Sequence, residues 1–306
     1  MRSYSAAETC MLLLFAPIAE GEALGRSAYK RLLRTMEALG TGGDPEEALT
    51  EGELLRLGAG SEEAKRILAR LDQREALERH LSVLDRLGIT VLTRLSPEYP
   101  RRLRQVLGQN APMLLYCAGN LSLFGTRCMA LVGSRQLRQP GRDFAAAAGR
   151  AMADQGFTYV SGGAVGADTA GFAGAVAGQG NAILFLADSL EERMGTLRRE
   201  LAAGQLLLVS EYGYDHPFSA GRAMSRNRLI HAMGEKVFIA QSDYGGGGTW
   251  SGVMENLKAG WSPCYICNSE PEDPGTVGLT ERGCVPVDAR DLKRLEDLRE
   301  NQTSLF

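Results

Sequence analysis

The chain has 306 residues, of which 44% are hydrophobic and 23% are charged, and its formal net charge is −3 at pH 7. This composition is typical of a globular protein that buries a sizeable core. The small negative charge excludes a general positive field for nucleic acid, so binding of a polyanion would depend on local cations.

The sequence has no pattern of a secretory signal or a membrane span. The apolar run MLLLFAPIA (11–19) is short and has acidic residues on both sides, so we expect a buried helix there. Six cysteines are too few for a disulfide framework in a chain of this length. These features favour a protein of the reducing cytoplasm.

Residues 5–87 have the pattern of helices throughout. Between 61 and 88, isoleucine and leucine recur at helical spacing with charged residues between them, and Ser61 is a candidate N-cap. We expect a small all-helical domain over residues 1–88, and its sequence contains no site chemistry.

From residue 89 the pattern changes to short apolar segments, first at 89–93 and 113–119. After residue 126 such segments alternate with amphipathic ones. We expect strands at 128–133, 157–161, 181–186, 206–210, 236–240 and 263–267, and helices at 140–155, 167–178, 190–203, 219–233 and 249–260. This alternation predicts an α/β core over residues 89–288, a Rossmann-like, mostly parallel sheet with helices on both faces, followed by a short tail at 289–306. Ligands of such sheets bind beyond the carboxyl ends of the strands.

The loop after the first strand of this core is a candidate phosphate contact. Gly133 permits a tight exit from the strand, Ser134 offers a hydroxyl, and Arg135 places a fork of donors next to a helix start. An ordinary turn with a solvated Arg135 explains the same residues equally well.

The loop after the second strand is rich in small residues: Ser161, Gly162, Gly163 and Gly166. Such a loop lets backbone amides approach a ligand, and the following helix directs its positive end toward the loop. Its glycine spacing is neither the dinucleotide fingerprint nor a Walker loop. Asp168 is expected to cap the loop amides, although a contact to a ligand stays open.

Four glycines in a row, 245–248, stand between a later strand and its helix, and Gly247, Gly248 and Thr249 are the expected contact residues. Such a run is costly in chain entropy, and Thr249 suits an N-cap or a phosphate contact. This segment is the strongest local signal for anion binding in the chain.

A basic segment opens the helix expected at 219–233, with Arg222, Arg226, Asn227 and Arg228. Arg222 and Arg226 are four residues apart and share a helix face. In isolation this segment would be a solvated face. Because several small-residue loops lead to the same sheet edge, we interpret them together with these arginines as one anion-binding cradle.

Other chemistry finds little support in the sequence. The pair in CYIC (264–267) lies in an expected strand, where residues three apart point to opposite faces, so we expect no metal site and no cofactor. Glu211 and Glu255 are the acids best placed for catalysis, but Glu211 could equally hold an arginine and Glu255 could face solvent. We therefore expect no catalytic site.

The order of several segments resembles that of the DNA-processing protein A family (DprA, also called Smf), up to about residue 270. They are GITVLTRLSPEYPRRLRQVLGQNAPMLLYCAGNLSLF (88–124), VGSR (132–135), SGGAVGADTAGFAGAV (161–176), LVSEY (208–212) and SRNRLI (225–230), with GGGGTWSGVMENLKAG (245–260) in the place of the family's SGS turn. The resemblance implies a SAM-like helical domain before the Rossmann-like core.

The family resemblance also implies a function. It implies a homodimer that binds and protects single-stranded DNA and loads a RecA-type recombinase during natural transformation. By position, the DNA site would include Gly133, Ser134, Arg135, Gly162, Gly163, Gly166, Arg226, Asn227 and Arg228. Single strands are held through phosphates and by stacking, for which Phe218, Tyr244 and Trp250 are candidates.

The chain departs from the family pattern in four places. Val165 stands where the family has an arginine, and an acidic segment, LADSLEERMG (186–195), replaces a glycine-rich one. AGRAMS (220–225) replaces a proline-rich lead, and about twenty residues follow Pro286, too few for a C-terminal winged-helix domain.

A small-nucleotide sensor or a phosphoribohydrolase-like enzyme is the alternative, because the GGxGT turn of those enzymes resembles GGGGT (245–249). They place two acids directly after the threonine, where this chain has Trp250 and Ser251. Cleavage at a ribose needs a carboxylate to stabilise the developing cation. The sequence therefore favours DNA binding without catalysis.

Overall fold

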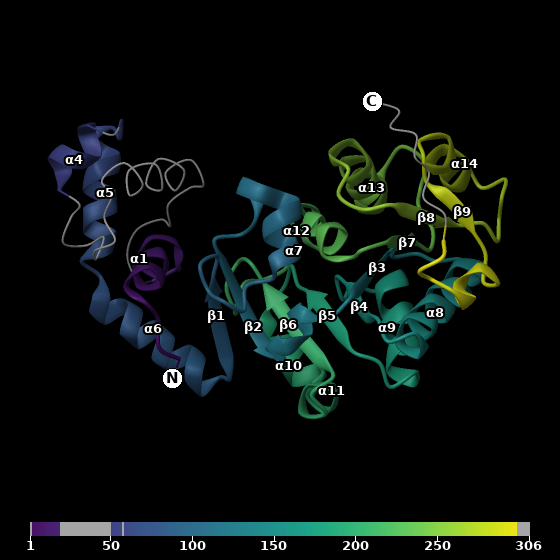
Figure 1. Ribbon diagram of the computed structural model, residues 1–306, viewed down its shortest axis with the longest axis horizontal. Coiled ribbons are helices and arrows are strands. Elements are labelled where there is room, and N and C mark those ends of the chain that lie inside the picture. Colours follow the sequence, from purple (N-terminus) through teal and green to yellow (C-terminus); the bar gives the residue numbers. More distant parts are fainter. Residues whose placement is uncertain (1, 19–49, 57, 299–306) are drawn as a thin grey trace. The chain divides into compact units, whose positions relative to one another are not determined.

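The computed structural model describes residues 2–18, 50–56 and 58–298 (Figure 1). The chain divides into two compact units, the first made of Met1–Tyr99 and Pro112–Tyr116, the second of Pro100–Ala111 and Cys117–Phe306. The domain boundary expected at residue 88 stays a prediction. The part of the expected helical region at 19–49 and the end of the tail at 299–306 lie outside the described residues.

The first unit contains the helices α1 (Ala6–Phe15), α4 (Glu51–Arg56), α5 (Ser61–Leu71) and α6 (Arg74–Arg86). It also contains β1 (Ile89–Thr93), which is hydrogen-bonded to β2 (Leu114–Gly119). The apolar run at 11–19 begins within α1, where Met11 to Leu14 are buried as expected. The N-cap expectation was wrong, because Ser61 is the first residue of α5 and Gly60 occupies the cap without a side-chain bond.

A parallel sheet forms the centre of the second unit. Its strands are β3 (Cys128–Val132), β4 (Thr158–Ser161), β5 (Ala182–Phe185), β6 (Leu206–Ser210), β7 (Val237–Ile239), β8 (Cys264–Cys267) and β9 (Val285–Val287). Their order is β6-β5-β4-β3-β7-β8-β9, with parallel pairing throughout. In the central strand β3, Ala130 is in register with Val160 and Val237. The predicted Rossmann-like α/β fold is confirmed.

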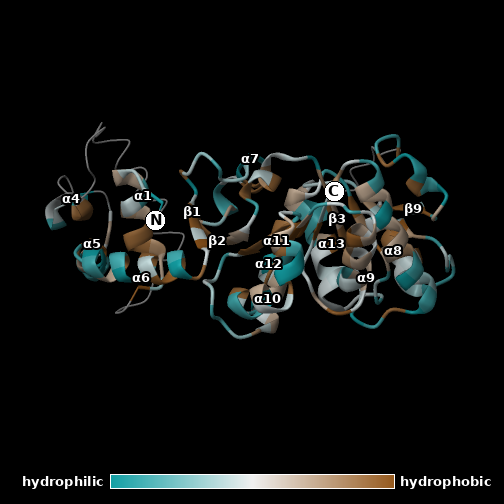
Figure 2. Cartoon of the chain, turned by 90° about the horizontal axis from the view of Figure 1, so that it is seen from below, coloured by the Kyte–Doolittle hydropathy of each residue, from teal (hydrophilic) through white to brown (hydrophobic). Residues whose placement is uncertain are grey.

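Helices cover both faces of this sheet (Figure 1). The helices α8 (Gln139–Asp154) and α9 (Ala167–Ala177) pack together on one face, and α12 (Ala220–Met233) and α13 (Gly247–Ala259) pack together on the other. Every residue of β3, β4, β5 and β6 is buried, and Figure 2 shows hydrophilic residues on the helices, for example on α12. Apolar strands covered on both faces account for the unbroken hydrophobic runs in the sequence.

The remaining elements of the second unit are shorter. They are α7 (Arg101–Leu107), α10 (Leu190–Thr196), α11 (Arg198–Ala202), α14 (Pro274–Glu281) and the 3₁₀ helices η1 (Gly108–Asn110), η2 (Leu121–Gly125) and η3 (Asp291–Lys293). The single helix expected at 190–203 is thus two helices that meet at Leu197, two residues after the poor helix former Gly195 in the last turn of α10. The sequence analysis also missed α7, α14 and β9.

The first residues of the expected tail pack onto the second unit. Leu292 and Leu295 are buried, and the side-chain amide of Gln155, the C-cap of α8, donates to the Leu292 carbonyl at 2.8 Å. None of the helices in the described ranges is both long enough and apolar enough to cross a membrane.

Candidate functional site

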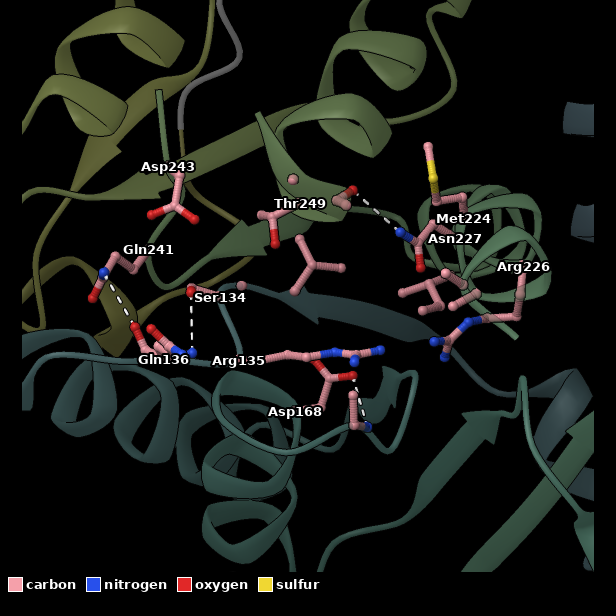
Figure 3. Close-up of a pocket in the computed structure, with 18 of the residues that line it drawn as sticks. Ser134, Arg135, Gln136, Asp168, Met224, Arg226, Asn227, Gln241, Asp243 and Thr249 are labelled. Atoms are coloured by element: carbon pink, nitrogen blue, oxygen red, sulfur yellow. Dashed lines mark hydrogen bonds between the residues drawn. The ribbon is translucent and has the colours of Figure 1, made fainter. Parts of the chain in front are cut away.

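A pocket of about 770 Å³ opens at the carboxyl ends of β3 and β7 (Figure 3). The strand that follows β3 in the chain, β4, lies on one side of it, and β7 lies on the other. Ligands of open parallel sheets bind at such a change of direction. Eight expected cradle residues line the pocket: Gly133, Ser134, Arg135, Arg226, Asn227, Gly247, Gly248 and Thr249. The lining does not include the other six: Ser161, Gly162, Gly163, Gly166, Arg222 and Arg228.

Ser134 is held in place by three loops. Its N–H donates to the Gln241 carbonyl at 2.9 Å, and its own carbonyl accepts from the N–H of Ala167 at 3.2 Å. Its hydroxyl accepts from the N–H of Gln136 at 3.1 Å (Figure 3) and keeps its own proton for donation. Gly166, with φ +91°, permits this contact, because a Cβ there would overlap the Ser134 carbonyl. The loop after β4 therefore fixes the position of Ser134 in the pocket.

Arg135 is an exposed cation of the pocket. Its side chain runs across the pocket (Figure 3), and its guanidinium carbon lies 4.9 Å from the centre of the Phe218 ring. Among the described residues, Arg135 has no acidic partner within ion-pair distance. It can therefore bind an incoming anion without first breaking an ion pair.

The other arginines of the pocket are already engaged. Arg138 forms ion pairs with Glu270, at 2.8 Å, and with Asp273. Arg226 is only 5% exposed and donates to the Phe185 carbonyl. Arg135 is therefore the lining arginine of the described chain that is most available to a ligand.

Arg226 supports the loop after β4 from within. Its guanidinium lies against Gly162, where any side chain would overlap it. The carboxylate of Asp168 accepts from the N–H groups of Gly162, at 3.2 Å, and Ala164, at 3.1 Å. Burial raises the pKa of Asp168, whereas the nearby Arg226 cation and these N–H groups act in the opposite direction. Asp168 thus caps the loop amides as expected, and Arg226 stabilises its charge.

Arg228 faces away from the pocket. It forms a bidentate ion pair with Glu211, at 2.6 and 2.5 Å, and both side chains are less than 10% exposed. Glu211 therefore holds an arginine. Glu255 is exposed on α13 and is not part of the pocket lining, so neither acid considered for catalysis lies in the pocket.

The first turn of α13 supplies backbone donors to the pocket. Its N-cap, Gly246, has no side chain to accept their hydrogen bonds, and Thr249 extends its hydroxyl into the pocket (Figure 3). The side-chain amide of Asn227 donates to the Gly248 carbonyl at 3.2 Å and so links α12 to α13. Free N–H groups at the positive end of a helix form an anion-binding site.

The sequence analysis missed five polar residues of the lining, which are Gln136, Arg138, His231, Gln241 and Asp243. Gln241 follows β7 and accepts from the Arg138 N–H at 2.9 Å, while Asp243 and Gln136 stand on the same side of the pocket (Figure 3). For Gln136, Gln241 and Asp243 the signal was a position within four residues of the end of a strand, from which side chains reach the carboxyl edge of the sheet.

The three aromatic candidates differ in exposure. Phe218 is 52% exposed and lines the pocket, and Tyr244 is 57% exposed. Trp250 is only 9% exposed and belongs to the core. Phe218 and Tyr244 are thus the rings that a ligand can reach.

The cysteines form no metal site in the described part of the chain. Cys264 and Cys267 are both buried in β8, and no group of three metal-ligating side chains occurs among the described residues.

A family model described as DNA recombination-mediator protein A matches residues 90–268, more than half of the chain. The chain belongs to the DNA recombination-mediator protein A family. The matched region of this family includes the loops after β3, β4 and β7, which build the pocket and its support. Among curated proteins, none matches the chain.

Solved structures of this family share the fold. DNA processing protein A (DprA) of Streptococcus pneumoniae is 20% identical, over 97% of this chain and all of its own, with a TM-score of 0.73. DNA processing protein A of Helicobacter pylori is 24% identical, over 67% of this chain and 94% of its own, with a TM-score of 0.56. The structure of the latter concerns its single-stranded DNA binding mode.

Proposed function

We propose that this chain binds single-stranded DNA at the pocket and mediates recombination by handing the strand to a RecA-type recombinase. Membership of the recombination-mediator family supports the role, and the Helicobacter pylori relative supports single-stranded DNA as the ligand. The observation that carries the proposal is the exposed Arg135 beside the uncapped first turn of α13.

These groups suit one phosphate of the strand. The N–H groups of the first turn of α13 and the hydroxyls of Ser134 and Thr249 are donors to its oxygens, and Arg135 supplies the opposite charge. Contacts to phosphate carry no information about base sequence. We therefore expect binding with little sequence preference.

The unpaired bases of the nucleotides on either side of this phosphate would extend toward the exposed rim of the pocket. Phe218 lies at that rim, with Arg135 over its ring. Stacking of bases on aromatic rings tolerates any sequence and distinguishes a single strand from a duplex, whose bases are already stacked. Phe218 thus favours single strands over duplex DNA.

The proposed action is binding and transfer, without catalysis. Glu211 is neutralised by Arg228, and Glu255 lies outside the pocket. The proposed assembly is a homodimer, which sedimentation analysis of the chain with and without DNA would test. Loading is tested by whether the chain speeds the assembly of a recombinase on DNA covered by single-strand binding protein.

The decisive experiment is fluorescence anisotropy of a labelled oligo-dT over a series of salt concentrations, with unlabelled duplex and AMP as competitors. We compare the wild-type chain with Arg135→Ala and with Arg198→Ala. Arg198 is an exposed arginine of α11, which leads into the amino end of β6 at the opposite edge of the sheet.

We expect binding that weakens with salt, is displaced by single strands but not by AMP, and is lowered at least tenfold by Arg135→Ala alone. Displacement by AMP would instead indicate a small-nucleotide site. Equal binding by the two variants would refute the assignment of Arg135.

A further inference from the structure

Tyr244 is an exposed aromatic residue next to the pocket. It lies between β7 and α13, and Asp243, directly before it, and Gly246, two residues after it, both line the pocket. More than half of its surface, 57%, is open to solvent. The ring therefore stands within one or two residues of the proposed phosphate site.

The ring of Tyr244 rests on a built support. Gly278 of α14 lies so close that a Cβ there would come within 2.5 Å of two ring carbons. The ring of Trp250 touches the same ring at a centroid distance of 5.1 Å. The Arg282 guanidinium lies over both rings, 5.7 Å from the centre of Tyr244 and 5.1 Å from that of Trp250, and donates to the Gly278 carbonyl at 2.8 Å. These contacts restrain the ring, while 57% of the residue's surface stays open to solvent.

The same arrangement occurs at Phe218. Each of these exposed rings has an arginine over it, Arg135 for Phe218 and Arg282 for Tyr244. Phe218 precedes α12, and Tyr244 precedes α13, so the two rings lie on the loops that lead into the two helices whose first turns line the pocket. A strand with one phosphate in the pocket therefore has an aromatic ring near it on each of these two loops.

We propose that Tyr244 is a stacking platform for an unpaired nucleobase of the strand whose phosphate occupies the pocket. This inference rests on the proposed function. A ring held in advance loses little entropy on binding, and the neighbouring Arg282 adds positive charge where a polyanion passes. A nucleobase is an occupant that matches both the flat apolar ring and this charge.

The test is a comparison of Tyr244→Ala, Tyr244→Leu and Tyr244→Phe in the anisotropy assay, with Val277→Ala as the control. Val277 is also exposed, on the same helix as Gly278, but is not aromatic. Each protein is titrated with oligo-dT and with oligomers of the same length in which every base is missing. Thermal unfolding checks that each variant is folded, and Tyr244→Leu keeps apolar bulk on Gly278.

We expect Tyr244→Ala and Tyr244→Leu to bind oligo-dT between about fivefold and a hundredfold more weakly, and Tyr244→Phe to bind like the wild type. The loss should vanish on the abasic oligomers, and the salt dependence should not change, because no phosphate contact is removed. Unchanged affinity of Tyr244→Leu while Arg135→Ala weakens binding overturns this inference alone. Equal losses on intact and abasic oligomers also overturn it. Absence of any wild-type binding overturns the proposed function, and this inference with it.

Discussion

Arg228 and Glu211 form a buried, bidentate ion pair that joins α12 to the loop after β6. Arg228→Met would remove the cation that faces the buried Glu211 carboxylate, and breaking a buried ion pair in this way typically costs about 3–5 kcal/mol. We therefore expect a lower free energy of unfolding, measured with urea, and unchanged salt dependence of DNA binding. Arg193→Met is the matched control, since its partner Asp188 is 25% exposed and such pairs contribute at most about 1 kcal/mol. A stable Arg228→Met that has lost DNA binding would mean that Arg228 contacts DNA.

The number of phosphates bound by one pocket can be obtained from the dependence of DNA affinity on salt concentration. Since Arg135 is the most available of the lining arginines, we expect about one phosphate contact for each pocket. For a single strand this gives a slope of log K against log salt concentration of about −0.7. An oligomer of about six nucleotides, short enough for one pocket, is suitable for anisotropy. A slope several times steeper would show that cations outside the pocket share the binding.

Gly166→Ala should damage both stability and binding. The backbone at Gly166 has φ +91°, and a methyl group there would overlap the Ser134 carbonyl, so the loop after β3 must move. We expect a loss of more than about 1 kcal/mol in the free energy of unfolding, together with weaker DNA binding. Gly125→Ala is the control, since nothing lies within 4 Å of its added Cβ and its φ is not positive. Normal DNA affinity of Gly166→Ala would separate this loop from the binding site.

The attraction between Arg226 and Asp168 predicts a pH dependence. Burial already raises the pKa of Asp168, and removal of the Arg226 cation raises it further. A carboxyl group with a raised folded-state pKa contributes stability below its unfolded pKa, near 3.9, and loses that contribution as pH rises through the folded value. Arg226→Met should therefore be closest to the wild type in stability near pH 4 and fall behind it toward pH 7.

The control for this prediction is the double variant Arg226→Met with Asp168→Asn. Because it has no carboxyl group to titrate, its unfolding midpoint should differ from that of Asp168→Asn by the same amount at every pH between 4 and 7. A deficit of Arg226→Met that does not change with pH would contradict the electrostatic role of Arg226.

Much of the second unit could be predicted from sequence because its strands are short and rich in apolar residues. All six expected strands are present, and the pocket lies where the carboxyl ends of β3 and β7 meet. The sequence analysis missed the strand β9 because its sequence, VPV, is short and contains a proline. The helix α14 has two glycines and two threonines in eight residues, which weakens its helical signal.

The roles of the arginines could not be read from their spacing. Arg226 and Arg228 are two residues apart, or about 200° around a helix, so they point in different directions. The sequence does not tell which direction is that of the pocket, and in the structure Arg228 turns to Glu211. Likewise Gly162 is small to accommodate the Arg226 guanidinium. The sequence analysis attributed its small size to a ligand.

The glycine at position 246 leaves the N–H groups of α13 open to a ligand but stabilises the helix less than a capping side chain would. Its backbone is extended, at φ −148°, and nothing lies within 4 Å of a Cβ at this position, so serine or aspartate would fit. An aspartate cap would stabilise α13 by about 0.3–1 kcal/mol. Its carboxylate would also take the N–H groups proposed for phosphate and repel the strand. Stabilising this family member by ordinary helix capping would therefore abolish the proposed function.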